Sequence, residues 1–104
     1  MKAMMLTGIK QMEMRDITEP AVVNSNDVKI KMKALGICGS DIHYYTQGQI
    51  GSQKVQYPFC VGHEGAGVVV EVGKTVTMVK PGDKIAIDPA MPCYKCDQCL
   101  SGRH

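Results

Sequence analysis

The sequence predicts a mainly β fold, a small barrel or sandwich of short strands joined by glycine-containing turns. In Val28–Ala34, apolar residues alternate with lysines, which is the period-two pattern of a half-buried strand. Val68–Val70 is a run of β-branched residues, which favour the pleated backbone of a sheet. Lys80–Asp83 contains Pro-Gly, a strong turn signal, and separates this run from a further strand at Ile85–Ile87.

The N-terminal residues predict a hairpin. Apolar and charged residues alternate in Met12–Arg15, so we expect this segment to pair with Lys2–Leu6 around a turn at Thr7–Gly8. Glu19–Pro20 and the polar run Asn24–Asp27 are typical of turns and separate the hairpin from the next strand.

One short helix is expected in the middle of the chain. Ser40 offers a side-chain cap ahead of Asp41–Tyr45, and the helix should end near Gly48. The polar, glycine-containing residues Gln49–Tyr57 that follow are expected to form a loop.

Size, charge and hydropathy exclude several classes of protein. A chain of 104 residues fits one domain, residues 1–104, and 44% hydrophobic residues are ordinary for a folded protein. The net charge of +2 comes from interspersed lysines and acids, so no basic face for a nucleic acid is expected. No apolar run approaches the roughly 20 residues that cross a bilayer, and none resembles a signal peptide. We therefore expect a cytoplasmic protein with no membrane partner.

The C-terminal residues contain a cysteine knuckle. Cys93, Cys96 and Cys99 stand in a C-x-x-C-x-x-C pattern, whose thiolates can turn back onto one tetrahedral ion. In a reducing compartment these cysteines are more plausible as metal ligands than as disulfides. A structural zinc site is the first interpretation; an iron–sulfur cluster uses the same spacing, and unliganded buried thiols are the third alternative. A fourth ligand is absent before the sequence ends.

A second set of metal-ligand residues is dispersed. Cys38, His63 and Glu64 come from separate stretches and together offer a thiolate, an imidazole and a carboxylate. A catalytic zinc needs this kind of set, with few protein ligands and one open position. Each residue alone is weak evidence, because a lone cysteine is more often buried and a lone histidine more often structural. We interpret Cys60 as a small buried hydrophobic residue.

The spacing of glycines around the histidine resembles a known signature. The matching residues are Gly62, His63, Glu64, Gly67, Gly73 and Val76. In this spacing the chain is similar to the zinc-containing alcohol dehydrogenases of the medium-chain family. Gly36–Tyr45 and the knuckle stand in the order and at the distances of that family, and Ile42–Tyr45 resembles its sorbitol and xylitol (polyol) dehydrogenase branch. The resemblance implies the N-terminal portion of a GroES-like, irregular β-barrel.

The resemblance also implies ligand roles. Cys38 and His63 would bind a catalytic zinc, and Glu64 would either bind it directly or lie behind it and exchange in. Asp41 would hold the His63 ring and raise its basicity. The three knuckle cysteines, Cys93, Cys96 and Cys99, would bind a structural zinc, with a fourth cysteine expected just past His104.

Three residues near Cys38 would serve the substrate. Ser40 and His43 match the hydroxyl and imidazole that pass the alcohol proton to solvent, and Tyr44 is a candidate for the wall of the substrate pocket. An alternative stays open for the first two residues: Ser40 only caps the helix, and His43 is a surface residue.

The implied activity is oxidation of a secondary alcohol or sugar alcohol by hydride transfer to NAD or NADP. No G-x-G-x-x-G motif follows a strand in these residues, so the dinucleotide would bind to a Rossmann domain that they do not contain. This segment alone is expected to be inactive, and the longer protein to be a homo-oligomer, a dimer or tetramer. Two other functions stay open: a non-catalytic GroES-like scaffold, and a zinc-knuckle interaction module.

Overall fold

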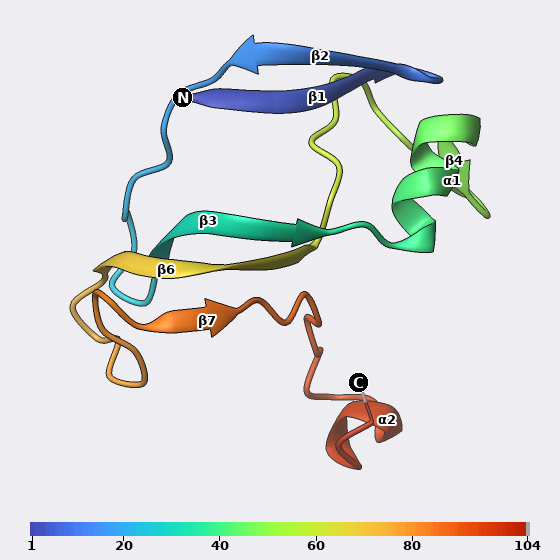
Figure 1. Ribbon diagram of the computed structural model, residues 1–104. Helices are drawn as coiled ribbons and strands as arrows, with labels where there is room; N and C mark the ends of the chain where they lie inside the picture. The colour runs from blue at the N-terminus through green and yellow to red at the C-terminus, as the bar shows by residue number, and fades with distance from the viewer. Residues whose placement is uncertain (104) are drawn as a thin grey trace.

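The computed structural model describes residues 1–103 and confirms a mainly β fold (Figure 1). The elements are, in chain order, β1 (Lys2–Gly8), β2 (Gln11–Asp16), β3 (Val28–Gly36), α1 (Gly39–Gln47), β4 (Gln49–Ile50), β5 (Gln53–Lys54), β6 (Glu64–Val72), β7 (Lys84–Ala86) and α2 (Asp97–Leu100). They form the sheets β1-β2, β3-β6-β7 and β4-β5. Among the described residues, no helix is both long enough and apolar enough to cross a membrane.

The N-terminal hairpin is confirmed, but its turn lies further along the chain than expected. β1 and β2 pair antiparallel as far as Gly8 and Gln11, and the chain turns at Ile9 and Lys10. Lys10 has a φ of 58°, in the left-handed region that a tight turn requires. The register shifts between Leu6 and Gly8, and this irregularity lets the pairing continue past the expected turn.

The three-stranded sheet contains the strands expected from the β-branched and alternating runs. β3 pairs with β6 along its whole length, and β6 pairs with β7 on its other side. The expected half-burial of alternate residues in β3 is wrong, because Met32, Lys33, Ala34 and Leu35 are all exposed. The β3–β6 register shifts twice, and the shift between Met32 and Ala34 breaks the two-residue alternation of side chains within this exposed run.

The helix α1 begins at Gly39, two residues before its expected start, and has a different cap. Cys38 is the N-cap residue, and the side chain of Asp41 accepts the backbone N–H of Cys38. The expected cap, Ser40, is already inside the helix. Gly48 ends α1 as predicted, with a φ of 68° in the left-handed region that favours glycine. The expected loop after it contains the short β4–β5 hairpin.

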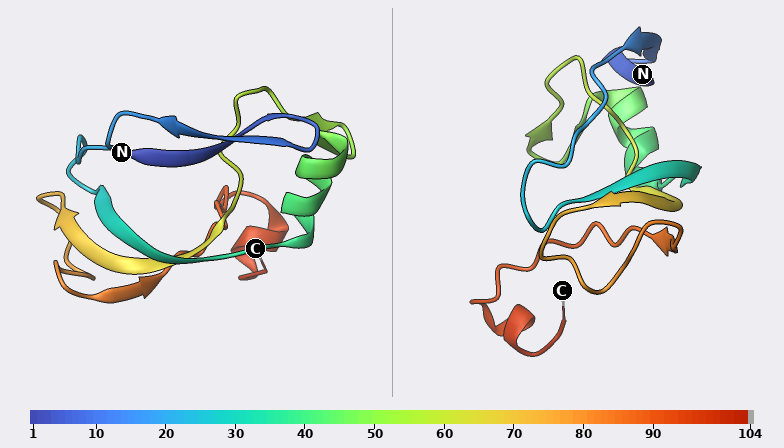
Figure 2. Two further views of the ribbon diagram at one scale, coloured as in Figure 1. Left: turned by 45° about the horizontal axis from the view of Figure 1, so that its top comes forward. Right: turned by 90° about the vertical axis from the view of Figure 1, so that its left-hand side faces the viewer.

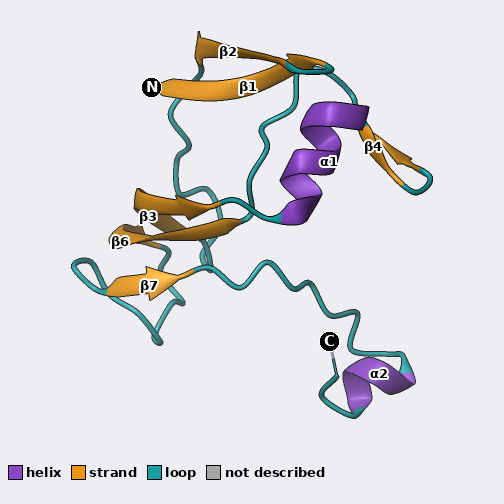
Figure 3. Ribbon diagram, turned by 45° about the vertical axis from the view of Figure 1, so that its right-hand side comes forward, coloured by secondary structure: helices purple, strands orange, loops and turns teal. Residues whose placement is uncertain are grey.

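The hydrophobic core among the described residues is small. Leu6 and Val69 are the two fully buried apolar side chains, one in the hairpin and one in the three-stranded sheet. Leu6 exchanges two backbone hydrogen bonds with Phe59, of 2.8 and 2.9 Å, which hold the segment before β6 against the hairpin. Figure 2 shows this segment crossing between the two sheets, with α1 beside it. In Figure 3, α2 lies at the end of an extended segment that follows β7.

Candidate metal centres

The dispersed candidate ligand residues meet at one end of the three-stranded sheet. Gly36, the last residue of β3, pairs with Glu64, the first residue of β6. Cys38 lies two residues beyond the end of β3, and His63 lies one residue before β6. The antiparallel pairing therefore brings Cys38, His63 and Glu64 together, and one potential ligand atom of each lies within 4.8 Å of the others.

The carboxylate of Asp41 contacts the segments that carry two of these residues. Its Oδ2 accepts the backbone N–H of Cys38 at 2.9 Å, and its Oδ1 lies 3.4 Å from Nδ1 of His63. The latter contact does not meet hydrogen-bond geometry, so Oδ1 has no donor among the described residues although it is buried. Asp41 is only 7% exposed, and it lies in the first turn of α1, where the helix dipole favours a negative charge.

The donor set fits a zinc ion. Zinc binds thiolate, imidazole and carboxylate ligands at about 2.0–2.3 Å, so two ligand atoms on one tetrahedral ion lie about 3.5 Å apart. The 4.8 Å limit on the cluster of Cys38, His63 and Glu64 is only slightly larger, and side-chain rotation would close the difference. Buried Asp41 Oδ1 can accept a hydrogen bond from Nδ1–H of His63 once the ring turns slightly, which leaves Nε2 for a metal.

The three residues expected to serve the substrate all lie on α1. The Oγ of Ser40 is buried and has no hydrogen-bond partner among the described residues, whereas His43 is exposed. Tyr44 is half-buried and packs edge-on against Phe59, with ring centroids 5.5 Å apart. A cavity of about 460 Å³ beside Tyr44 is also lined by Phe59 and the mostly polar residues Gln53–Gln56. Ser40 and His43 stand three residues apart on the helix, but no hydrogen bond between them is present.

The knuckle cysteines also form a cluster. Potential ligand atoms of Cys93, Cys96 and Cys99 lie within 4.8 Å of one another, and the sulfurs of Cys93 and Cys99 are 3.6 Å apart. Tyr94, which follows Cys93, has a φ of 56°, in the left-handed region that tight turns use. Backbone N–H groups of Lys95 and Cys96 lower the pKa of the Cys93 thiol to about 7, which favours the thiolate that metals bind.

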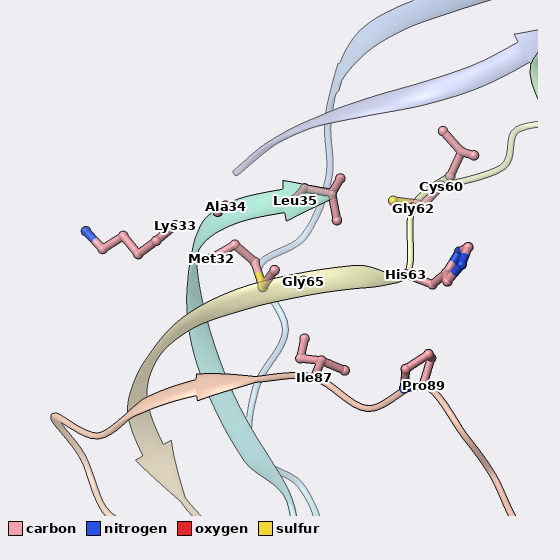
Figure 4. A pocket seen from close by; sticks show the side chains of 11 residues that line it. Met32, Lys33, Ala34, Leu35, Cys60, Gly62, His63, Gly65, Ile87 and Pro89 are labelled. Atoms are coloured by element: carbon pink, nitrogen blue, oxygen red, sulfur yellow. The ribbon is translucent and has the colours of Figure 1, made fainter. Parts of the chain in front are cut away.

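The structure places Cys60 on the surface, where the sequence analysis expected a buried residue. It is exposed and lines a largely apolar pocket of about 670 Å³ together with Leu35, His63 and Ile87 (Figure 4). The interpretation of Cys60 as a buried residue is therefore wrong. The preceding residue, Phe59, bridges to Leu6 in extended pairing, and the next side chain of an extended segment points the opposite way. Sequence analysis missed this pocket because its lining comes from three segments far apart in the chain.

The backbone before the candidate ligand His63 requires a glycine. Gly62 has a φ of 112°, a conformation that residues with side chains rarely adopt. A Cβ at this position would also lie 2.8 Å from Cδ2 of Leu35. Both the backbone conformation and the close packing on β3 therefore explain the glycine at position 62.

The mainly β fold, the cysteine–histidine–glutamate cluster and the separate cysteine knuckle agree with the alcohol dehydrogenase family that the sequence resembles. The chain belongs to the alcohol dehydrogenase GroES-like domain family, whose family model matches residues 24–104. This match confirms the family and the GroES-like fold that the signature indicated.

Known relatives act on alcohols and polyols. A sorbitol dehydrogenase of Bacillus subtilis (strain 168) is 41% identical over 104 residues, which is 100% of this chain and 29% of that protein. The crystal structure of galactitol-1-phosphate dehydrogenase from Escherichia coli matches with a TM-score of 0.84 and 29% identity, covering 97% of this chain and 28% of the other.

A zinc-dependent alcohol dehydrogenase 2 from Streptococcus pneumonia, in its apo form, matches with a TM-score of 0.75 and 30% identity. This match covers 97% of the present chain and 28% of the other chain. The chain therefore spans less than a third of the length of each of these three proteins.

Proposed function

We propose that this chain is the N-terminal, metal-binding part of a zinc-dependent dehydrogenase that oxidises a secondary alcohol or a sugar alcohol. NAD or NADP would accept the hydride. The single observation that carries the proposal is the meeting of Cys38, His63 and Glu64 at one end of the sheet. The polyol relatives support a substrate with several hydroxyl groups.

In this proposal the two clusters have different tasks. Cys38, His63 and Glu64 hold the catalytic zinc, because they combine mixed ligands with partial exposure and leave room for a substrate. When bound, this zinc supplies Lewis-acid stabilisation of negative charge on the substrate oxygen. Cys93, Cys96 and Cys99 hold a structural zinc together with one further ligand, because closed structural sites have four protein ligands.

Residues of α1 orient the ligands and move the proton. Asp41 Oδ1 lies 3.4 Å from Nδ1 of His63, and a small rotation of the ring would let it accept a hydrogen bond from Nδ1–H, which fixes the ring and its tautomer. The buried Oγ of Ser40 has an unused donor and acceptor, which makes it suitable for receiving the alcohol proton. Exposed His43 then transfers the proton to solvent, because an imidazole can both accept and donate a proton. Tyr44 forms one wall of the substrate pocket.

The remaining parts of the proposal concern the longer protein. The dinucleotide binds to a Rossmann domain outside these 104 residues, so the present segment alone is inactive. We place the protein in the cytoplasm, because the five free cysteines are compatible with a reducing compartment. The longer protein assembles as a homo-oligomer, a dimer or tetramer.

A reduction assay on the complete gene product tests the proposal. We expect the purified protein to reduce NAD or NADP with sorbitol, xylitol or a simple secondary alcohol, and a chelator to abolish the activity. A folded, zinc-loaded protein that reduces neither cofactor with any of these substrates would contradict an enzymatic function. That result would favour the non-catalytic scaffold or the zinc-knuckle interaction module.

A further inference from the structure

The backbone of Gly36 packs closely against the side chain of Glu64. The two residues are Cα partners at the end of the β3–β6 ladder. A Cβ at Gly36 would lie 2.5 Å from Oε2 of Glu64, 3.0 Å from its Cβ and 3.5 Å from its Cδ. The Glu64 carboxylate therefore occupies the space that any side chain at position 36 would fill.

The backbone of Gly36 does not itself require a glycine. Its φ lies outside the left-handed region, so alanine can adopt the same conformation without backbone strain. The nearest atoms that a Cβ at this position would meet all belong to Glu64. What the glycine provides at this position is thus space for one particular side chain.

We infer that Gly36 is a positioning residue, which leaves the room that Glu64 needs to reach Cys38 and His63. This inference rests on the proposed metal centre and deepens it. A methyl group at position 36 would push the carboxylate away from the other two ligands. Glu64 is exposed, and the end of its side chain is flexible, so the carboxylate can move at little cost to the fold. The metal site would then lose a ligand while the sheet stays intact.

Cobalt(II) in place of zinc provides the readout, because the absorption of cobalt depends on the number and type of its ligands. The experiment compares Gly36→Ala with Glu64→Gln and wild type in the complete gene product. We expect Gly36→Ala to change the cobalt spectrum in the same sense as Glu64→Gln and to weaken metal binding about 10- to 100-fold.

Gly39→Ala is the matched control. A Cβ at Gly39 meets no atom within 4 Å, and its φ is also outside the left-handed region. The Gly39→Ala variant adds the same methyl group three residues after position 36. We therefore expect its cobalt spectrum and metal affinity to match those of the wild type. A wild-type spectrum for Gly36→Ala, beside a changed spectrum for Glu64→Gln, would overturn the inference and leave the proposed metal centre standing.

A double-mutant cycle shows whether Gly36 acts through Glu64. In a Glu64→Ala background the carboxylate is gone, so Gly36→Ala should have no further effect on metal affinity. An equally large effect in that background would overturn the inference. If Gly36→Ala alone does not fold, recovery of folding in the Gly36→Ala/Glu64→Ala variant supports it, and failure to recover overturns it. Cobalt binding that is unaffected by Cys38→Ala would instead contradict the metal centre itself, and the inference with it.

Discussion

The carboxylate of Asp41 lies between two candidate metal ligands: one oxygen is 3.4 Å from Nδ1 of His63, and the other accepts the backbone N–H of Cys38 at 2.9 Å. One buried side chain thus caps α1 and faces the imidazole at the same time. Because Cys38 is the N-cap residue, the start of the helix and the geometry of the cluster depend on the same contact.

Replacing Asp41 should separate these two tasks. In Asp41→Asn, the amide oxygen can still accept the N–H of Cys38, but the amide nitrogen then faces Nδ1 of His63 and cannot accept its proton. We expect zinc affinity to fall about 10- to 100-fold, with little change in the free energy of unfolding. Asp41→Ala should additionally lower that free energy by about 1 kcal/mol, because the helix cap is lost.

Chelator competition measures the affinity of these Asp41 variants, and urea denaturation of the metal-free protein measures the unfolding. Wild-type zinc affinity in both variants would show that the carboxylate does not position His63.

Two cysteine substitutions should affect different properties, one the catalytic activity and the other the stability. Cys38→Ala removes a ligand of the catalytic zinc and should abolish turnover, with a smaller effect on the thermal midpoint. Cys96→Ala removes a ligand of the structural zinc and should mainly lower stability or disturb assembly. Steady-state kinetics and thermal unfolding of the complete gene product separate the two effects. Full activity and wild-type stability in both variants would disprove the assigned roles.

The turn before β3 should stabilise the fold in a pH-dependent way. The backbone N–H of Asn24, followed by that of Val23, holds the pKa of the Asp27 carboxyl below its ordinary value of 3.8. A lowered folded-state pKa means that this contribution to stability is present above pH 3.8 and is lost as the pH falls through the folded pKa.

Asp27→Asn should therefore destabilise the protein at pH 7, and the difference from wild type should shrink below pH 3.8. Urea unfolding of the metal-free protein at a series of pH values measures this. A difference that stays constant from neutral to strongly acidic pH would rule out the charged turn as its cause.

The exposed thiol of Cys60 provides a test of which cysteines bind zinc. Cys60 lines a pocket next to His63 but is not part of either cysteine-containing cluster. We expect Cys60→Ser to bind zinc with wild-type stoichiometry, because no proposed ligand is lost. Metal analysis of the purified variant checks this. Loss of one zinc ion in Cys60→Ser, but not in Cys38→Ala, would mean that the ligand assignment is wrong.

The strands were predictable because their signals are local, and so was the grouping of Cys38 with His63 and Glu64, because the family signature combines distant segments. Alternation in Val28–Ala34 and the β-branched Val68–Val70 indicated β3 and β6, and the family signature indicated which residues should meet. The expected hairpin turn and the half-burial of β3 were wrong because both depend on irregularities of register, and such irregularities have no clear signature in a single sequence.

The contacts that build the site were less predictable. The position of Glu64 over Gly36 depends on the pairing of β3 with β6, whose residues are far apart in the chain. Capping by Asp41 was missed because Ser40 is the more common capping residue, although an acidic residue three positions after Cys38 carried the signal. The exposure of Cys60 depends on the bridge between Phe59 and Leu6, which the sequence alone does not reveal.

Metal content of the freshly purified, unchelated full-length protein tests the central claim most directly. The proposal predicts two zinc ions per subunit, one held by Cys38, His63 and Glu64 and one held by the cysteine knuckle. Elemental analysis that finds one ion or none in a folded and unmodified protein would contradict it.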